Sequence, residues 1–402
     1  MTRPKILAIG ALPFYSAGKR TFEFGLSLFN EQLFPALARM GHRVRILAEA
    51  PLAEGNVNRT AIAWNIPNLT VDAFALEFRN GQLLASTPFR AGQYARARRL
   101  FEKIVREERP DIVVMARESL ALQFGGTAQE YGLPSIIIAQ GVPSASFLEE
   151  DFPANFRNGL VEQMGRSDLV ITVARHLAVT LARFGIARVR TITNVVDPAS
   201  FRPQQKDQHL LEQLRIAPDQ AIVAHISDLS AAKRPFDVVE SALRVLEQEP
   251  RTIYLVCGDG NERGALEKFC SDRGIASSFR FLGAVEHREI DRCINLADIV
   301  LSSSGREGYS LMCLEALACG RALLASNIPG SREMIADGRT GMLYKVGDCF
   351  DLVEKTLALI RDPDLRQRLG IAARRATETM SIAACAESYS DAICQVVATG
   401  SP

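Results

Sequence analysis

The chain has 402 residues, about twice the length of a common single domain, so the sequence predicts two domains and excludes a small binding module. Hydrophobic residues make up 47% and charged residues 23%, as in ordinary globular proteins, which excludes disordered, collagen-like and multi-span membrane classes. The formal net charge is only +1, whereas a protein that binds nucleic acid through its phosphates needs a basic excess.

The cysteines and the apolar runs indicate the compartment. All 8 cysteines lie at or beyond Cys257, without C-x-x-C pairs or zinc-like spacing to histidines. We therefore expect reduced thiols and no metal site. No apolar run has the length of a membrane helix, and the run that begins at Lys5 is too short for a signal peptide. The sequence indicates a cytoplasmic protein, and peripheral attachment to the inner membrane face stays open.

Short aliphatic runs alternate with segments of helical apolar spacing along the whole chain. This alternation is typical of parallel sheets that helices cover on both faces. In the first half, strands are predicted at residues 5–9, 43–47, 111–115, 135–139 and 168–172. A helix is predicted over residues 31–40, ended by Gly41. Residues 1–200 are therefore interpreted as one doubly wound α/β domain.

The same pattern restarts after a polar stretch at residues 202–213, which is interpreted as the linker between domains. Strands are predicted at residues 221–226, 252–256, 279–282, 298–301 and 322–325. From residue 350 the pattern is helical, with breaks near Asp362 and Ser381. Residues 201–379 are interpreted as a second doubly wound domain, and functional residues are expected just after its strands.

The segment from Ser302 to Gly320 carries the densest chemical signal. It follows a buried strand, passes through a loop of small residues and enters a helix. Free backbone N–H groups at the helix start can bind a phosphate, and they belong to Gly308, Tyr309, Ser310 and Leu311. Glu307 and Glu315 are eight residues apart, about 80° around a helix, so the first belongs to the loop and the second to the helix. Such carboxylates suit vicinal hydroxyls of a sugar and a ribose, although solvated glutamates beside a packing helix would have the same spacing.

This segment resembles the E-x7-E signature of retaining glycosyltransferases of the GT-B fold, most of all glycosyltransferase family 4. Further segments resemble that family in order and spacing, at residues 194–203, 225–235, 256–263 and 281–285. The resemblance implies two Rossmann-like domains that face each other across a cleft. The first would bind the acceptor and the second the nucleotide sugar, and a C-terminal helix within residues 380–402 would cross back to the first domain.

The resemblance also implies a role for each matching residue. Glu315 would bind the nucleotide ribose and Glu307 the hydroxyls of the donor sugar. Lys233 and the amides of residues 308–311 would bind the diphosphate. Further donor contacts would come from Val285 near the base, from Arg263, and from Gly18, which lets the first domain close on the phosphate. The implied activity is metal-independent, needs no cofactor, and moves a sugar with retention from a nucleoside diphosphate sugar, UDP-sugar favoured, to an acceptor hydroxyl.

Two positions depart from the family pattern. Asp228 stands where the family usually has an arginine beside the phosphates, and its charge would repel a diphosphate. Either Asp228 turns away, or Arg234 supplies the missing positive charge, or donor binding is altered. Gln140 stands where the family has a histidine that contacts the sugar or the leaving group. These departures keep a catalytically impaired nucleotide-sugar-binding protein open, beside a nucleotide-sugar epimerase or phosphorylase on the same fold.

The acceptor is not identified, and a small molecule, a lipid-linked compound and a glycan all stay open. Candidate acceptor contacts are Trp64, Glu77, Arg90 and residues 144–147. The basic run at residues 96–106 is interpreted as a solvated helix face, with anionic lipid or a phosphorylated acceptor as the alternative. The glycines at 258–264 do not fit a dinucleotide fingerprint, and Asp362 is interpreted as a helix cap rather than a metal ligand.

Overall fold

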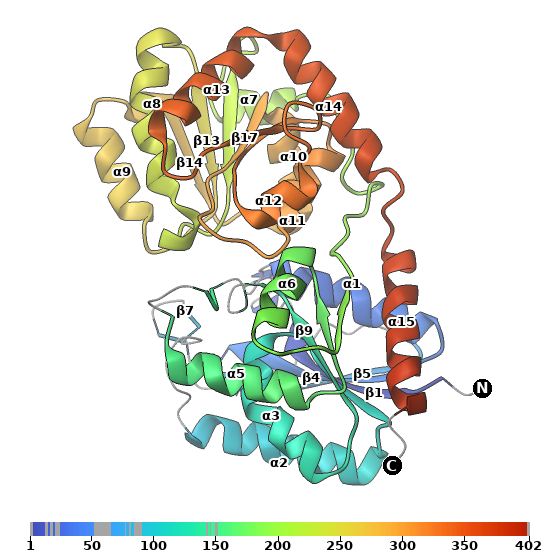
Figure 1. Ribbon diagram of the computed structural model, residues 1–402. Coiled ribbons are helices and arrows are strands. Elements are labelled where there is room, and N and C mark those ends of the chain that lie inside the picture. The colour runs from blue at the N-terminus through green and yellow to red at the C-terminus, as the bar shows by residue number, and fades with distance from the viewer. Residues whose placement is uncertain are drawn as a thin grey trace. The chain divides into compact units, whose positions relative to one another are not determined.

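The computed structural model describes residues 3–12, 15–16, 19–20, 25–51, 66–76, 78–79, 82–83, 91–141, 144, 146–148 and 152–399. The chain divides into unit 1, Met1–Asn194 with Ile382–Pro402, and unit 2, Val195–Ser381. The sequence interpretation places these divisions at residues 200 and 379, a few residues away. Each unit contains a parallel sheet with helices on both faces (Figure 1). Among the described helices, none combines the length and the apolar character that crossing a bilayer requires.

The sheet of unit 1 has seven parallel strands in the order β11-β10-β9-β8-β1-β4-β5. They are β1 (Lys5–Ala11), β4 (Arg43–Pro51), β5 (Leu69–Leu76), β8 (Ile112–Met115), β9 (Ser135–Ala139), β10 (Leu169–Thr172) and β11 (Val189–Thr191). Two short antiparallel pairs accompany them, β2 (Tyr15–Ser16) with β3 (Lys19–Arg20) and β6 (Phe78–Arg79) with β7 (Gln82–Leu83). All five predicted strands are present, and the edge strands β5 and β11 were not predicted.

Helices cover both faces of this sheet. They are α1 (Gly25–Arg39), α2 (Ala91–Glu108), α3 (Glu118–Glu130), α5 (Ala154–Arg166), α6 (Arg175–Arg183) and α15 (Ile382–Thr399). Phe101 of α2, Phe124 of α3 and Leu160 of α5 join one buried cluster with the strands. Helix α1 begins six residues before the start that the sequence predicts, and it packs against α15.

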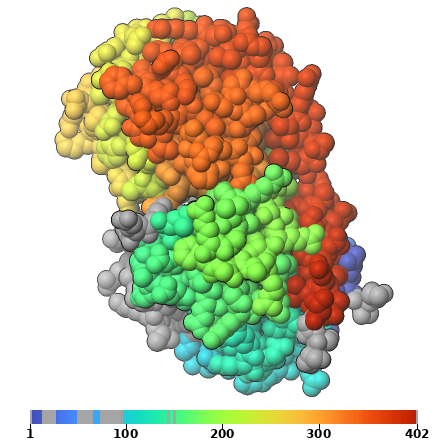
Figure 2. All heavy atoms as spheres, in the orientation of Figure 1, coloured from blue at the N-terminus to red at the C-terminus, as the bar shows by residue number. Residues whose placement is uncertain are grey.

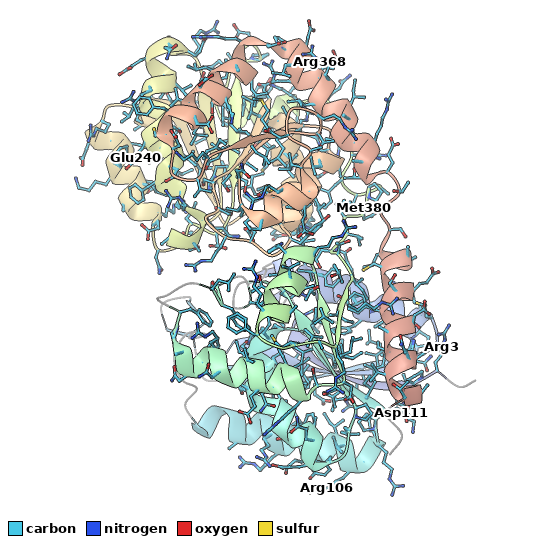
Figure 3. The ribbon with its side chains drawn as sticks, viewed as in Figure 1. Arg3, Arg106, Asp111, Glu240, Arg368 and Met380 are labelled. Carbon is cyan, nitrogen blue, oxygen red and sulfur yellow. The ribbon has the colours of Figure 1, made fainter. Side chains whose placement is uncertain are left out.

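The C-terminal helix α15 belongs to unit 1, which confirms the expected crossing back to the first domain. Tyr389 is buried, and its ring lies 6.1 Å from that of Phe29 on α1. Ser390 is tied from two sides, because Arg3 Nη1 donates to its Oγ at 3.0 Å and its hydroxyl bonds His42 Nε2 at 2.8 Å. Figure 2 shows red atoms of α15 directly beside green atoms of unit 1, and Figure 3 labels Arg3 next to this helix.

The sheet of unit 2 has six parallel strands in the order β14-β13-β12-β15-β16-β17. They are β12 (Ile222–Ile226), β13 (Ile253–Cys257), β14 (Phe279–Gly283), β15 (Ile299–Ser302), β16 (Ala322–Ser326) and β17 (Met342–Tyr344). The five predicted strands are present, and the edge strand β17 was not predicted. The four inner strands β12, β13, β15 and β16 are buried throughout, as expected of a sheet that is covered on both faces, whereas the edge strand β14 is partly exposed.

Two sets of helices form the faces of unit 2. Its helices are α7 (Gln208–Gln213), α8 (Pro235–Gln248), α9 (Arg263–Asp272), α10 (His287–Leu296), α11 (Leu311–Ala318), α12 (Pro329–Met334), α13 (Cys349–Arg361) and α14 (Pro363–Thr377), with the short 3-10 turns η1 (Ala231–Lys233) and η2 (Ala276–Ser278). Helices α8, α9 and α13 share one buried cluster with the strands, and α7, α10 and α11 share the other. The breaks predicted near Asp362 and Ser381 are confirmed, since α13 ends and α14 begins beside Asp362 and α15 begins after Ser381.

The polar stretch at residues 202–213 is not a linker, which corrects the sequence interpretation. Asp207 caps α7 by accepting a hydrogen bond from Leu210 N at 3.0 Å, and Arg292 Nη2 donates to the same carboxylate at 2.7 Å. Leu211 is 2% exposed in the core of unit 2. Leu210 and Leu214 pack against the same core, and the signal of such a short helix is weak in the sequence.

Candidate functional site

In the sheet of unit 2, the order in which the chain adds strands reverses between the two central strands, β12 and β15. After β12 the chain continues to β13 and β14 on one side, whereas after β15 it continues to β16 and β17 on the other. Doubly wound sheets bind ligands at the carboxyl ends of the strands at such a switch point. The loops that follow β12 and β15 carry Lys233 and Glu307. Two predicted site residues therefore lie where the topology favours ligand binding.

Hydrogen bonds and an ion pair join these two loops. Ser303 Oγ donates to Lys233 O at 2.7 Å. Lys233 Nζ donates to Glu307 Oε1, and the same oxygen accepts a hydrogen bond from Ser304 Oγ at 3.0 Å. The side chains of Lys233 and Glu307 are only 23% and 13% exposed. The ion pair is thus held in one arrangement, which an exposed surface pair would not be.

Lys233 keeps its positive charge at this site. Burial lowers the pKa of Lys233, but the carboxylates of Glu307 and Asp228 outweigh burial, and the pKa is raised above its ordinary value. Asp228 also accepts a hydrogen bond from Ser230 Oγ. The departure from arginine to aspartate at position 228 therefore adds a second carboxylate to the field of the lysine.

A neutral histidine, His225, lies at the end of β12 and supports the loops after β12 and β15. His225 is 2% exposed in β12, and burial lowers its pKa to about 4 against the opposing effect of a hydrogen bond to Leu301 O. Its Nδ1–H donates to Leu301 O at 3.1 Å, because a carbonyl can only accept. Its Nε2 then accepts from the hydroxyl of Ser227 at 2.9 Å. This chain of bonds ties the end of β12 to β15.

Glu315 lies in helix α11 and Glu307 in the preceding loop, as the spacing predicted. Glu315 is 6% exposed, and its Oε1 accepts a hydrogen bond from His287 Nε2 at 2.7 Å. His287 is the first residue of α10, and sequence reasoning did not select it. Its position just after the segment that contains Val285 was the available signal.

Helix α11, where the sequence predicts phosphate binding, begins with a side-chain cap. Ser310 caps the helix, and its Oγ accepts a hydrogen bond from Cys313 N at 3.4 Å. The first N–H groups of an α-helix have no partner within the helix and can bind an anion. A Cβ at Gly330 of α12 would lie 2.8 Å from both Glu307 O and Gly308 O. Gly330 therefore lets α12 pack closely against the loop before α11.

Two glycines let the loop after β13 pack against the loop after β12. A Cβ at Gly258 would lie 1.8 Å from Ser227 O, and one at Gly260 would lie 2.6 Å from Leu229 O. This close backbone approach explains the Gly258 and Gly260 pattern without a dinucleotide.

Arg263, a predicted donor contact, lies between two carboxylates. Its Nη1 donates to Asp259 at 3.1 Å and its Nε to Glu267 at 2.8 Å. It also lies against Gly283, where a Cβ would be 2.8 Å from Arg263 Nη1. The structure thus gives Arg263 a role in bracing the loop after β13.

Arg234 also has a carboxylate partner. Its Nε and Nη2 donate to the two oxygens of Asp237 at 2.8 and 2.9 Å. Arg234 adopts a left-handed conformation, with φ of 49°, between η1 and α8. Its guanidinium therefore supports the first turn of α8, and this bidentate pair occupies two of its N–H groups.

In unit 1, Gln140 follows β9, and its Nε2 is buried without a hydrogen-bond partner among the described residues. The next residue, Gly141, donates its N–H to Glu118 Oε1 at 3.0 Å. Ser144 Oγ donates to the same oxygen at 2.8 Å. Glu118 is 1% exposed at the start of α3. Sequence reasoning missed Glu118, although an acidic residue just after a buried strand was a usable signal.

The remaining predictions concern residues outside the described ranges, a helix face and a helix cap. Gly18, Trp64, Glu77 and Arg90 lie outside the described residues. Within the basic run, Arg98 pairs with Glu102 and Glu130 on an exposed face of α2, in agreement with the solvated-face interpretation. Asp362 caps α14 by accepting a hydrogen bond from Leu365 N at 2.7 Å, which confirms the capping interpretation.

The two parallel sheets covered by helices, together with the site at residues 225–315, define an α/β protein of the GT-B type. Sequence comparison identifies the family. Residues 25–200 match the family described as Glycosyltransferase Family 4, and residues 206–376 match Glycosyl transferases group 1. The chain therefore belongs to the group 1, family 4 glycosyltransferases.

Curated relatives match over part of their length. N-acetyl-alpha-D-glucosaminyl L-malate synthase of Bacillus anthracis is 28% identical over 186 residues, which is 46% of this chain and 48% of that protein. Putative glycosyltransferase EpsD of Bacillus subtilis is 28% identical over 198 residues, 49% of this chain and 51% of that protein. The chain spans about half the length of these curated relatives.

Solved structures match the whole fold at low identity. Anabaena Alr3699/HepE, solved with UDP-glucose, has a TM-score of 0.76 and 18% identity, and the match covers 98% of this chain and 100% of that one. Sucrose-phosphate synthase from Thermosynechococcus elongatus has a TM-score of 0.81 and 16% identity, over 98% and 99% of the two chains. These similarities establish the two-domain Rossmann-like fold.

Proposed function

We propose that this protein is a retaining, metal-independent glycosyltransferase that moves a sugar from a nucleoside diphosphate sugar, with a UDP-sugar favoured, to an acceptor hydroxyl. The observation that carries the proposal is the constrained Lys233–Glu307 pair at the switch point, beside the capped start of α11. It is supported by membership of the family and by the UDP-glucose bound to the Anabaena neighbour.

In this proposal each donor group meets a matching partner. The diphosphate contacts Lys233 Nζ and the backbone N–H groups of residues 308–311, which combine charge with directed hydrogen bonds. Glu307 accepts hydrogen bonds from the hydroxyls of the transferred sugar, and Glu315 accepts them from the ribose. Val285 faces the base.

The proposed reaction breaks the bond between the anomeric carbon and the donor phosphate oxygen. The acceptor oxygen bonds to the anomeric carbon on the same face, and the acceptor proton passes to the departing phosphate oxygen. The products are the glycosylated acceptor and the nucleoside diphosphate. Positive charge that builds up on the sugar ring is balanced by the nearby diphosphate, and Lys233 stabilises the negative charge on the leaving group.

A second candidate is a protein that binds the nucleotide sugar without turning it over. The carboxylate of Asp228 near Lys233 favours it, because that charge opposes a diphosphate at the position where the family has an arginine. The two candidates differ in turnover alone. UDP release from UDP-glucose supports the transferase, whereas UDP binding without release under any acceptor condition supports the binding protein.

Substitution of Lys233 tests the site. UDP affinity is measured by calorimetry, and UDP release from UDP-glucose is measured with water as the acceptor. Lys233→Ala is expected to weaken UDP binding about tenfold or more, because a charge-assisted contact contributes about 1.5 to 3 kcal/mol. Lys268→Ala on α9 is the matched control, since that lysine is 73% exposed. Equal UDP affinity in wild type and Lys233→Ala would contradict the proposed site.

The choice of base is tested by thermal shift with UDP, GDP, ADP and dTDP. A ligand present at 100 times its dissociation constant raises the unfolding free energy by about 2.7 kcal/mol. UDP is expected to stabilise the chain most. A larger effect of another nucleotide would redirect the donor assignment and leave the reaction class unchanged.

A further inference from the structure

His287 is held between an aromatic ring and a nearly buried carboxylate. Its Nε2 lies 2.7 Å from Glu315 Oε1, and the two side chains are 19% and 8% exposed. A carboxylate oxygen accepts hydrogen bonds, so Nε2 carries the hydrogen in this contact. The bond ties one oxygen of Glu315 to the first residue of α10.

The imidazole is itself restrained by Phe201. The centroids of the two rings are 5.4 Å apart and their planes are inclined by 49°. Phe201 is 7% exposed, its N donates to Asp197 O at 3.0 Å, and its carbonyl accepts from Arg374 Nη1 at 2.9 Å. A ring that packs on such a fixed neighbour has little rotational freedom, so His287 presents its Nε2–H to Glu315 in one direction.

His287 also connects the two parts of the proposed nucleoside site. It follows Val285 by two residues and begins α10, whereas Glu315 lies in the middle of α11. Helices α10 and α11 pack into the same buried cluster of unit 2. The contact between His287 and Glu315 therefore fixes the distance between the segment assigned to the base and the carboxylate assigned to the ribose.

We propose that His287 is a positioning residue that orients Glu315 toward a ribose 2′-hydroxyl and thereby makes the site selective for ribonucleotides over 2′-deoxyribonucleotides. The inference rests on the proposed function, because it assumes that Glu315 meets the ribose. With one oxygen held by His287, the other oxygen of Glu315 has a defined direction in which to accept from the nucleotide. A deoxyribose leaves that nearly buried acceptor unpaired, which is costly. Deoxynucleoside diphosphate sugars are then poor donors.

The test compares UDP with 2′-deoxy-UDP by calorimetry, which needs neither an acceptor nor turnover. In the wild type, UDP is expected to bind about 10- to 100-fold tighter than 2′-deoxy-UDP. His287→Phe keeps a ring against Phe201 and removes the donor, so this ratio is expected to fall about tenfold. His287→Gln supplies an N–H donor near the position of Nε2, and it is expected to restore the ratio to within about threefold of wild type.

A double variant shows whether His287 acts through Glu315. Glu315→Gln alone is expected to reduce the ratio, and adding His287→Phe is expected to change it no further. If His287→Phe does not fold, Phe201→Leu replaces it, since this variant loosens the imidazole and leaves its donor in place. Phe201→Leu is then expected to give a ratio between those of the wild type and Glu315→Gln.

The outcomes separate the inference from the proposed function. A wild type that does not bind UDP overturns the donor assignment and the inference with it. A wild type that prefers UDP, with the same ratio in His287→Phe, overturns the inference alone. The inference also fails if His287→Phe weakens the binding of UDP and of 2′-deoxy-UDP by the same factor, because His287 would then support the structure of the site without affecting its selectivity.

Discussion

Glu307 allows nucleotide binding to be separated from turnover. Its carboxylate contacts Lys233, and its side chain is 13% exposed. Glu307→Gln keeps the shape of the side chain and an oxygen that can accept from Ser304, but removes the negative charge. The substitution is therefore expected to leave the fold intact while changing the charge that a bound diphosphate meets.

The two functional effects of Glu307→Gln are expected to have opposite signs. Loss of the carboxylate removes a repulsion toward the diphosphate, which partial contact with water reduces to about 1 kcal/mol. UDP is therefore expected to bind about 3- to 10-fold tighter. Turnover is expected to fall about 10- to 100-fold, because the hydroxyls of the transferred sugar lose a charged acceptor that contributes about 1.5 to 3 kcal/mol.

Both effects are measured on the same protein preparations. Calorimetry gives the affinity for UDP, and a coupled assay gives the rate at which UDP is released from UDP-glucose. Glu247→Gln on the exposed face of α8 is the control, and it is expected to match the wild type in both measurements. A parallel fall in UDP affinity and turnover would show that Glu307 supports Lys233 rather than meeting the sugar, and would refute the reasoning.

Three further predictions follow from described contacts. Arg234→Ala is expected to change UDP affinity by less than about threefold in calorimetry, because its guanidinium is bound to a carboxylate of α8; a tenfold loss would revive its role as the missing phosphate contact. Glu118→Ala is expected to lower turnover about tenfold while UDP affinity is kept, because the loop after Gln140 loses its two hydrogen bonds to the Glu118 carboxylate. Asp168→Ala, which removes a hydrogen bond to a backbone N–H at the start of β9, is the control and should retain turnover. His225 has a pKa of about 4 in the folded protein against an ordinary value of 6.5. Between pH 6.5 and about 4 the unfolded state binds more protons than the folded state, so the free energy of unfolding falls by about 3 kcal/mol in total as the pH drops through this range. Chemical denaturation should show this slope in wild type, and His225→Asn should flatten it.

The central strands could be predicted from the sequence because each is a continuous aliphatic run between turn residues. The missed strands β5, β11 and β17 all lie at sheet edges. Strands β5 and β11 contain polar or charged residues that the aliphatic signal excludes, and β17 is only three residues long. In β5, Asp72 is such a residue, and it accepts a hydrogen bond from Arg45 Nε at 2.5 Å. Helix α7 was missed because it is short and polar apart from its leucines.

The candidate site was predictable as a set of positions but not as a set of contacts. Loops after parallel strands converge whatever their sequence, so the strand pattern alone assigns Lys233 and Glu307 to one place. Whether an arginine is available to a ligand depends on which acidic side chains the fold brings into contact with it. Arg263 illustrates this point, because its acidic neighbours on both sides become its partners only in the folded loop.

The pairing of these arginines changes how the anion site should be understood. Lys233 is a cation at the switch point, and the carboxylates of Glu307 and Asp228 both act on it. These carboxylates reduce the net positive charge that Lys233 offers to a diphosphate. We therefore expect the proposed phosphate contacts to depend also on the direction of backbone N–H groups at the start of α11, which is capped by Ser310 and follows the loop packed closely against Gly330. Asp228 is then compatible with a working donor site, because the charge-assisted hydrogen bonds from these N–H groups to a phosphate can offset part of the repulsion from its carboxylate.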